Sequence, residues 1–107
     1  MSNNSEQLLY IISTNVVGTN KSDLKLQTDA IGAFLYAFTL ATDAMDAGNK
    51  VKIALLEDYY HPTIEEIILV EHFSFKEEYE TEYQERIKEA KNTGEVVYGP
   101  FFLYEEN

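Results

Sequence analysis

One apolar run near the start of the chain restricts the fold more than any other feature. Leu8–Val17 is almost continuously hydrophobic and strand-forming, and Gly18 ends it. A strand with one face in water alternates apolar and polar residues, whereas a nearly continuous run is typical of a strand covered on both faces. We therefore predict an interior strand in a layered α/β fold.

The next segment predicts a helix and then a second strand. Apolar side chains recur at three- and four-residue spacing over Ala30–Ala47, with Thr28 or Asp29 as the N-cap and Gly48 at the C-cap. Lys50–Leu56 opens with alternation and then becomes wholly apolar, as expected of a strand that enters the core.

The middle of the chain is open to two interpretations. Glu57–Thr63 is predicted to be a loop, because Pro62 moves His61 out of helical geometry. Within Ile64–Phe73 the first isoleucines are spaced as in a helix, whereas the run Ile67–Val70 fits a strand. Both stay open, and we prefer the strand.

A charged helix and a broken strand are predicted for the last third. Ser74 and Glu77 have the spacing of a capping box, and Gly94 ends the helix. Val96–Tyr104 is predicted to be a strand that Gly99–Pro100 interrupts. The apolar face of the helix consists of Phe75, Tyr79, Tyr83, Ile87 and Ala90.

The predicted order is β-α-β, then a strand or loop, then α-β, and no repeat or linker divides it. We therefore expect a single domain, residues 1–107. The fold class we favour is α/β, a three-layer domain with a mainly parallel sheet flanked by helices. If Ile64–Phe73 is a strand, the alternative is an α+β, ferredoxin-like βαββαβ arrangement.

Two stretches resemble the DsrE/DsrF-like family of small sulfur-relay proteins. The opening strand, loop, Ala- and Phe-rich helix, glycine and second strand of that family are similar to the stretch LLYIISTNVVGTNKSDLKLQTDAIGAFLYAFTLATDAMDAGNKVKIALLED. A later helix, glycine and strand of the family are similar to Glu77–Pro100. The resemblance implies a mainly parallel sheet and a binding or scaffold subunit tied to sulfur relay. Sulfur-carrying members use a cysteine, so this chain resembles a shortened member without sulfur transfer.

Composition removes several kinds of chemistry. The chain contains no cysteine, so disulfides, thiolate metal ligands, persulfides and thiol nucleophiles are excluded. Its two histidines lie in acidic or apolar surroundings, and no nucleophile-elbow sequence accompanies them. We expect a protein that uses no cofactor and is not an enzyme.

The charge of the chain limits its partners. A net charge of -11 disfavours direct binding of nucleic acid and of anionic membranes. Residues 57–107 contain fourteen acidic and four basic residues, against five and four in residues 1–56. Residues Met1–Gln7 lack the features of a signal peptide, and no apolar run is long enough to span a bilayer. We therefore expect a cytoplasmic protein.

The acidic second half also suggests an alternative function. Carboxylates beside aromatic rings can present a DNA-like surface, so the chain could inhibit a basic or nucleic-acid-binding partner. A simpler interpretation is the solvated face of an amphipathic helix. The acidic residues concerned are Glu77, Glu78, Glu80, Glu82, Glu85 and Glu89.

Candidate ligand-binding residues follow the predicted strands. Ser13–Asn20 is interpreted as a loop of small polar residues, which could wrap an anion or simply be a surface loop. The pocket candidates are Thr14, Asn15, Gly18, Asp58 and Tyr98. Divalent-metal candidates, at a spacing that matches no known motif, are Glu57, Asp58, His61 and His72.

Aromatic residues are abundant after the middle of the chain. Core packing explains most of them, but Val96–Tyr104 carries more large apolar groups than one face can bury. Since aromatic residues are favoured at protein interfaces, we expect a homo-oligomer and allow for another protein partner. The aromatic residues concerned are Tyr59, Tyr60, Tyr98, Phe101, Phe102 and Tyr104.

Overall fold

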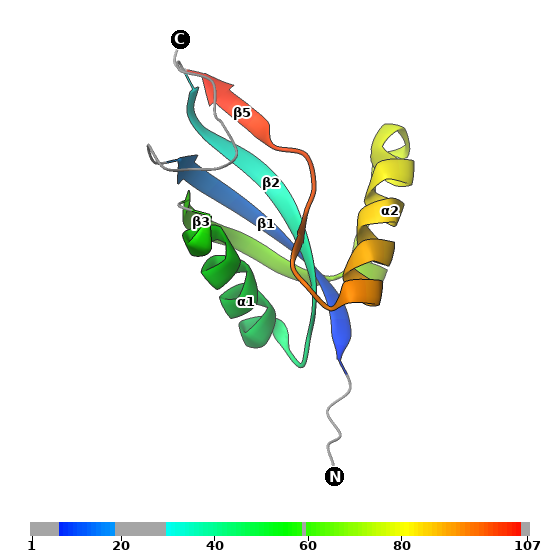
Figure 1. Ribbon diagram of the computed structural model, residues 1–107. Coiled ribbons are helices and arrows are strands. Elements are labelled where there is room, and N and C mark those ends of the chain that lie inside the picture. The colour runs from blue at the N-terminus through cyan, green and yellow to red at the C-terminus, as the bar shows by residue number, and fades with distance from the viewer. Residues whose placement is uncertain (1–6, 19–29, 59, 106–107) are drawn as a thin grey trace.

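A computed structural model describes residues 7–18, 30–58 and 60–105 (Figure 1). A five-stranded sheet lies between two helices, one on each face. The elements are β1 (Leu8–Gly18), β2 (Ala30–Ala41), α1 (Ala44–Glu57), β3 (Tyr60–Leu69), the 3-10 turn η1 (Val70–His72), α2 (Glu77–Thr93), β4 (Val97–Tyr98) and β5 (Phe102–Glu105).

Every pairing in the sheet is antiparallel. The strand order is β3-β1-β2-β4, and β5 also pairs with β2. β4 pairs with Ala37 and Phe38, whereas β5 pairs with the Ala30–Phe34 part of β2, so the two short strands share one edge of the sheet. The predicted interruption at Gly99–Pro100 is confirmed, because it separates these two strands.

The predicted fold class is wrong. The sheet is antiparallel and the element order is ββαβαββ, so the protein is α+β and has neither a mainly parallel sheet nor the ferredoxin-like βαββαβ order. The error arises in one region. Ala30–Ala41 was expected to be helical and is strand β2, while Lys50–Leu56 was expected to be a strand and lies inside α1.

Side-chain size explains why β2 is a strand. Both faces of β2 are covered, so polar and apolar residues do not alternate, but aromatic side chains alternate with smaller aliphatic ones from Ala33 to Phe38. Phe34, Tyr36 and Phe38 face α2, whereas Ala33 and Ala37 face α1. The three- and four-residue spacing that suggested a helix is a by-product of a nearly continuous apolar run.

Helix α1 begins later than the sequence suggested. Asp43 is its N-cap and accepts a hydrogen bond at Oδ1 from the backbone N–H of Asp46, at 2.8 Å. The N-cap expected at Thr28 or Asp29 lies outside the described residues. Gly48 is not a C-cap, because it is buried within α1, where a Cβ atom would lie 2.9 Å from Cδ1 of Ile67. The glycine therefore lets α1 approach β3 closely.

The core consists of two clusters separated by the sheet. The prediction that Leu8–Val17 is an interior strand is confirmed, because adjacent Ile11 and Ile12 of β1 are both buried, one on each face. The cluster under α1 includes Ile12, Leu35, Val51 and Leu55. The cluster under α2 consists of Ile11, Phe38, Tyr83, Ile87, Ala90 and Val97.

Strand β3 replaces most of the predicted loop at Glu57–Thr63, since the strand begins at Tyr60. It forms an edge of the sheet, where a proline such as Pro62 is tolerated. Its pairing with β1 shifts register between Ser13 and Thr14. The preference for a strand in Ile64–Phe73 is confirmed as far as Leu69.

Helix α2 agrees with the sequence in its apolar face and its end. Gly94 has φ 73° and caps the C-terminus in the left-handed region, as predicted. The capping box at Ser74 is wrong, because the helix begins at Glu77 after Lys76, which makes no side-chain cap hydrogen bond. Of the described helices, none combines the length and hydrophobicity needed to cross a membrane.

Candidate binding site

A cleft of about 300 Å³ opens between the sheet and the first half of α2. Aromatic rings from β2, the connection before α2, α2 itself and β5 form most of its walls. The residues that line it are Phe34, Tyr36, Phe73, Ser74, Phe75, Lys76, Tyr79, Tyr83 and Phe102.

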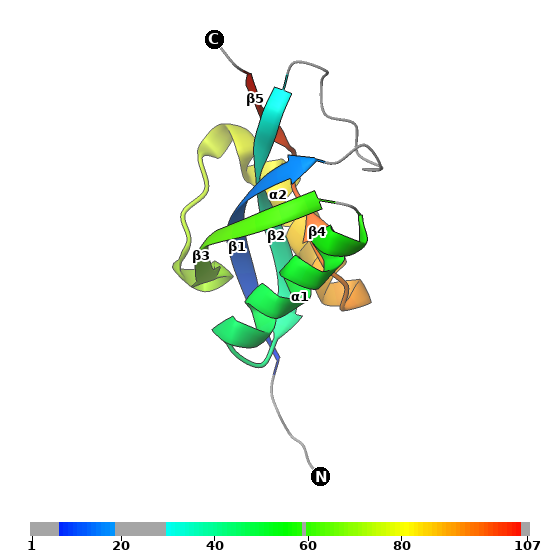
Figure 2. The ribbon, with the colours of Figure 1, turned by 90° about the vertical axis from the view of Figure 1, so that its left-hand side faces the viewer.

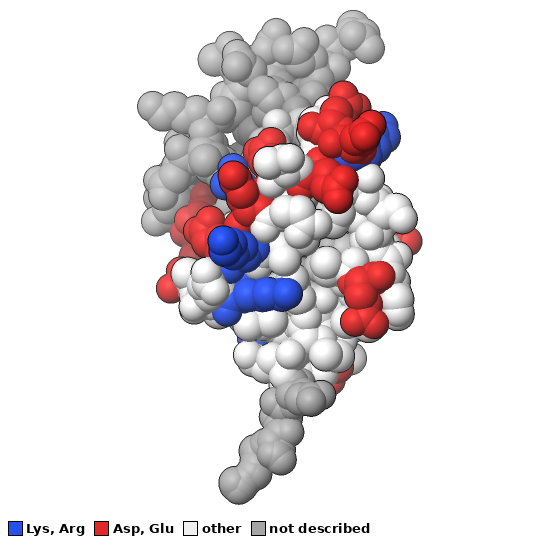
Figure 3. All heavy atoms as spheres, turned by 90° about the vertical axis from the view of Figure 1, so that its right-hand side faces the viewer, with Lys and Arg blue, Asp and Glu red and all other residues white. Residues whose placement is uncertain are grey.

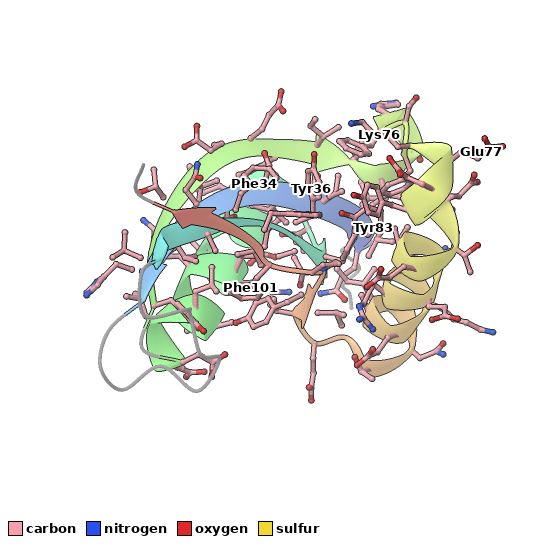
Figure 4. All side chains as sticks on the ribbon, turned by 90° about the horizontal axis from the view of Figure 1, so that it is seen from above. Phe34, Tyr36, Lys76, Glu77, Tyr83 and Phe101 are labelled. Atoms are coloured by element: carbon pink, nitrogen blue, oxygen red, sulfur yellow. The ribbon has the colours of Figure 1, made fainter. Side chains whose placement is uncertain are left out.

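Two periodicities bring these rings together. Alternation along β2 places Phe34 and Tyr36 on the face that α2 covers. Four-residue spacing along α2 turns Tyr79 and Tyr83 toward the same face. In Figure 4, Phe34, Tyr36 and Tyr83 lie between the sheet and α2, whereas Phe101 lies on the side of α1.

The rings hold one another at edge-to-face and tilted angles. Tyr36 meets Phe34, Phe73 and Tyr83 with ring centroids 5.1, 5.4 and 5.7 Å apart and planes 85°, 68° and 88° apart. Phe75 lies 5.1 Å from Tyr83. Aromatic pairs in such arrangements contribute about 0.5–1.5 kcal/mol each beyond the burial of their area. These contacts therefore stabilise the wall of the cleft.

Tyr83 forms the floor and stays neutral. Only 3% of it is exposed, and burial, followed by the neighbouring Tyr36, Glu82 and Tyr79, raises its pKa to about 12. Because the pKa lies far above physiological pH, the phenol adds no charge to the cleft.

Among the residues that line the cleft, Lys76 carries the charge, and acidic residues follow it in the first turn of α2. Lys76 lines the cleft just before α2, and Glu77 begins the helix on its outer side, away from the rings (Figure 4). Glu77, Glu78 and Glu80 are exposed in the first turn. Carboxylates in the first turn complement the positive end of the helix dipole, which gives them a structural role as well. Basic residues enter α2 only later, at Arg86, Lys88 and Lys91.

The surface around α2 therefore carries both acidic and basic side chains. Figure 3 shows acidic and basic side chains side by side around a broad area without charge. Arg86 lies 3.4 Å from the carboxylate of Glu82, one turn earlier. The excess of acid is therefore greatest at the N-terminal end of α2, where the cleft opens.

A second cleft, of about 450 Å³, lies beside α1 and brings together two of the predicted pocket residues. The Tyr98 hydroxyl donates a hydrogen bond to Oδ2 of Asp58, at 3.2 Å. Burial and then the Asp58 carboxylate raise the pKa of Tyr98 far above its usual value. Lys50 also lines this cleft and donates a hydrogen bond to the Leu40 carbonyl at 2.9 Å.

The other three pocket candidates are not in a loop. Thr14, Asn15 and Gly18 belong to β1, which corrects the loop expected at Ser13–Asn20 as far as the described residues extend. Thr14 is fully buried, whereas Asn15 donates a hydrogen bond to Oε2 of Glu65 on the neighbouring strand, at 2.7 Å. Adjacent strand residues point to opposite faces, so Thr14 and Asn15 do not share a site.

The metal candidates are spread over the molecule. Glu57 and Asp58 end α1 and His61 lies in β3, while His72 lies in η1 beyond the other end of β3, where its Nε2 is 3.6 Å from Glu71. The described part of the chain contains no group of three or more His, Cys, Asp or Glu side chains arranged to hold a metal ion.

The sequence analysis named most of these rings but did not predict that they form a cleft. The assignment of Tyr79 and Tyr83 to a helix face is correct, whereas Phe75 lies in the connection before α2 and Phe34 lies in β2. The alternation of aromatic with smaller aliphatic residues around Tyr36 was the signal for a strand. Once β2 is a strand, its rings necessarily face a helix that presents tyrosines.

Comparisons with protein-family models, curated proteins and solved structures found no match for the chain. The resemblance to the DsrE/DsrF-like family therefore stays a prediction. The sheet lends it no support, because residues 30–57 form a strand and then a helix, the reverse of the helix and strand on which the resemblance depends.

Proposed function

We propose that this protein is an acidic, non-catalytic binding domain whose aromatic cleft receives an apolar side chain from a positively charged protein partner. The observation that carries the proposal is the position of the cleft, walled by Tyr36, Tyr79 and Tyr83 and opening at the most acidic end of α2. A cytoplasmic location and a homo-oligomeric state belong to the same proposal.

The size of the cleft supports an apolar side chain as its occupant. Pockets for small molecules usually measure about 300–1,000 Å³, so a cleft of about 300 Å³ suits a single ring or branched aliphatic group. Ring faces and edges supply dispersion contacts for such a group. The exposed Ser74 and Lys76 add polar contacts at the mouth.

The charge of the protein decides the charge of the partner. Lys76 lines the cleft and by itself favours an anion, but Glu77, Glu78 and Glu80 follow it in the first turn of α2, and the whole chain has a net charge of -11. A field of this sign repels anions and accelerates the approach of cations. A basic peptide segment with one apolar side chain matches both the acidic first turn of α2 and the aromatic wall of the cleft.

A second candidate, an inhibitor of a basic or nucleic-acid-binding protein, is favoured by the exposure of Glu77, Glu78, Glu80, Glu85 and Glu89 on α2. Arg86, Lys88 and Lys91 interrupt this row in the second half of the helix. Charge reversal at Glu78, Glu82, Glu85 and Glu89 weakens binding under this hypothesis. A sulfur-relay scaffold function rests on the family resemblance alone.

A titration with short peptides, followed by NMR chemical shifts, tests the leading proposal. The probes are Lys-Lys-Phe-Lys-Lys, the same peptide with Ala in place of Phe, and Glu-Glu-Phe-Glu-Glu, all with blocked ends. We expect the first to shift the resonances of Ser74, Tyr79 and Tyr83, and the other two to have much smaller effects. Equal shifts from all three peptides would contradict the proposal.

Matched charge reversals make the test specific to the cleft. The triple variant Glu77→Lys, Glu78→Lys, Glu80→Lys should abolish the effect of the basic peptide. The control is Glu85→Lys, Glu89→Lys, Glu95→Lys, which changes the net charge equally and leaves the first turn of α2 intact. If both triples weaken binding to the same extent, only the overall charge matters and the cleft does not.

A further inference from the structure

We propose that two copies of this chain associate through the outward face of α1. The contact is formed by a row of four residues, Met45, Asn49, Lys52 and Leu56, which we call the α1 stripe. The inference does not depend on the aromatic cleft, because α1 and α2 lie on opposite faces of the sheet (Figure 1).

Helix α1 leaves large apolar side chains in water, two of them in the α1 stripe and the third, Ile53, next to it. Among the described residues, five large hydrophobic side chains are exposed, and α1 carries three of them: Met45 at 76%, Ile53 at 57% and Leu56 at 48%. Single exposed apolar residues are normal on a protein surface, but several on one short helix indicate an interaction surface.

Helical geometry aligns the stripe. Eleven residues separate Met45 from Leu56, which places them within about 20° of each other around the helix axis. Ala47, Gly48, Val51 and Leu55 are buried against the sheet, whereas all four residues of the stripe are exposed, along one side of the helix. Figure 2 shows α1 in front of the sheet, with its outer side uncovered by any other described element.

The spacing of the stripe is that of a seam between paired helices. Steps of four, three and four residues from Met45 to Leu56 match the positions at which coiled helices interlock. Polar residues at such positions lower stability and fix the register. Asn49 and Lys52 therefore favour one arrangement of the two helices.

That arrangement is antiparallel and two-fold symmetric. It sets Met45 of one copy against Leu56 of the other, and Asn49 against Lys52. The side-chain oxygen of Asn49 can then accept a hydrogen bond from the Lys52 ammonium group, and no like charges meet in the seam. A surface that complements itself in this way gives a closed dimer.

Charge identifies a second copy as the occupant. Two molecules of net charge -11 repel each other, so they meet most easily where their surfaces are neutral. Helix α1 is neutral, since Asp46 and Glu57 balance Lys50 and Lys52, whereas α2 contains six acidic and three basic residues. Because α1 has no excess of acidic residues, it would not attract a strongly basic partner.

The aromatic residues expected to form the oligomer contact are less suited to it. Tyr60 is fully buried, and the half-buried Phe101 packs against Tyr60 and Tyr98 with ring centroids 5.6 and 6.1 Å away. Tyr59 lies outside the described residues. The α1 stripe is more exposed than these rings, and it replaces them as the proposed contact.

The interface is small, so the dimer dissociates readily. A helix of 14 residues is about 21 Å long, and one pair of such helices buries less than the about 1,200 Å² typical of stable complexes. We therefore expect reversible association, with monomer at low micromolar concentration and dimer near millimolar concentration.

Sedimentation velocity over that concentration range tests the proposal. The variant Met45→Glu, Leu56→Glu should remain monomeric throughout, with an unchanged far-UV circular dichroism spectrum. The control Gln84→Glu, Asn92→Glu adds the same charge at exposed positions of α2 and should dimerise as the wild type does. A wild type that stays monomeric near millimolar concentration, or a Met45→Glu, Leu56→Glu variant that still dimerises, would overturn the proposal.

Introduced cysteines test the register, since the native chain has none. Under oxidising glutathione, an equimolar mixture of Met45→Cys and Leu56→Cys chains should form mainly the mixed disulfide. Either variant alone should form several-fold less cross-linked product. A majority of like-with-like cross-links would contradict the antiparallel arrangement.

Discussion

The two faces of the sheet are packed in opposite ways. On the α1 face, Ala33, Ala37 and Ala47 are fully buried, and Gly48 brings the helix close to β3. On the α2 face, large rings such as Tyr36 and Tyr83 hold the helix away from the sheet at one end. Small residues pack α1 closely against the sheet, and the cleft on that face lies beside the helix, at Asp58 and Tyr98. On the other face, rings that meet edge-on leave a cleft between the helix and the sheet.

The difference in packing suggests that the two faces of the sheet have different roles, one in stability and the other in binding. A closely packed layer of small and branched side chains leaves little room for a ligand beneath the helix, and a lost side-chain atom leaves a cavity. A layer of partly exposed rings keeps apolar surface available to a partner. We infer that the α1 face mainly stabilises the fold, while the cleft on the α2 face binds.

The largest expected effect is the loss of a buried side chain on the closed face. Leu55 is fully buried under α1, so Leu55→Ala should lower the free energy of unfolding by about 2–5 kcal/mol. Its neighbour Leu56 is 48% exposed, and Leu56→Ala should change stability by less than about 0.5 kcal/mol. Urea unfolding at low protein concentration measures both, and equal losses would contradict the packing described for α1.

A smaller loss is expected at the start of the same helix. Asp43→Ala removes the side-chain oxygen that accepts a hydrogen bond from the Asp46 N–H at 2.8 Å. The free energy of unfolding should fall by about 0.5–2 kcal/mol. Asp43→Asn keeps an oxygen acceptor and should recover most of the loss in thermal unfolding. If Asp43→Asn were no better than Asp43→Ala, the capping hydrogen bond would not be the cause.

Alkaline pH should weaken the α2 face. The pKa of Tyr83 is about 12 in the folded chain and the ordinary value is 10.0, so between these pH values the unfolded chain loses a proton that the folded chain retains. Stability must therefore fall as pH rises through this window, and below it Tyr83 has no effect. Tyr83→Phe should reduce this fall in the urea midpoint. Tyr98, on the other face, contributes in the same direction.

The smallest effect is expected at the rim of the cleft. Lys76→Ala should leave stability within about 0.5 kcal/mol of the wild type, because Lys76 is exposed. Removing its charge should tighten binding of Lys-Lys-Phe-Lys-Lys about two- to five-fold, the effect of one exposed charge pair. Lys88→Ala, farther along α2, is the control. Weaker binding of the basic peptide to Lys76→Ala would indicate a site for anions.

Local signals in the sequence predicted part of this fold. The continuous run at Leu8–Val17, the tyrosine face of α2 and the left-handed cap at Gly94 each depend on residues close in sequence, and all three are confirmed. The strand β2 could not be recognised by polarity, because both of its faces are buried. Because Ala30–Ala47 was assigned to a helix, Lys50–Leu56, which lies in α1, was assigned to the next strand. Two strands joined by a helix then indicated a parallel sheet.

The candidate site depended on that same segment. Of the five pocket candidates, Asp58 and Tyr98 are joined by a hydrogen bond although they lie 40 residues apart, whereas the other three belong to β1. The aromatic cleft needs the antiparallel pairing of β2 with β1 and β5, which places Phe34 and Phe102 on one wall. No spacing within a single segment indicates this, so a correct sheet topology is required before the cleft can be predicted.

The most direct test of the binding role is an NMR measurement of contacts between protons of the Lys-Lys-Phe-Lys-Lys phenyl ring and the protein. The account predicts intermolecular nuclear Overhauser effects from that ring to the rings of Tyr36, Tyr79 and Tyr83. Contacts that instead reach the surface of α1, or the cleft of Asp58 and Tyr98, would contradict the assignment of the aromatic cleft as the binding site.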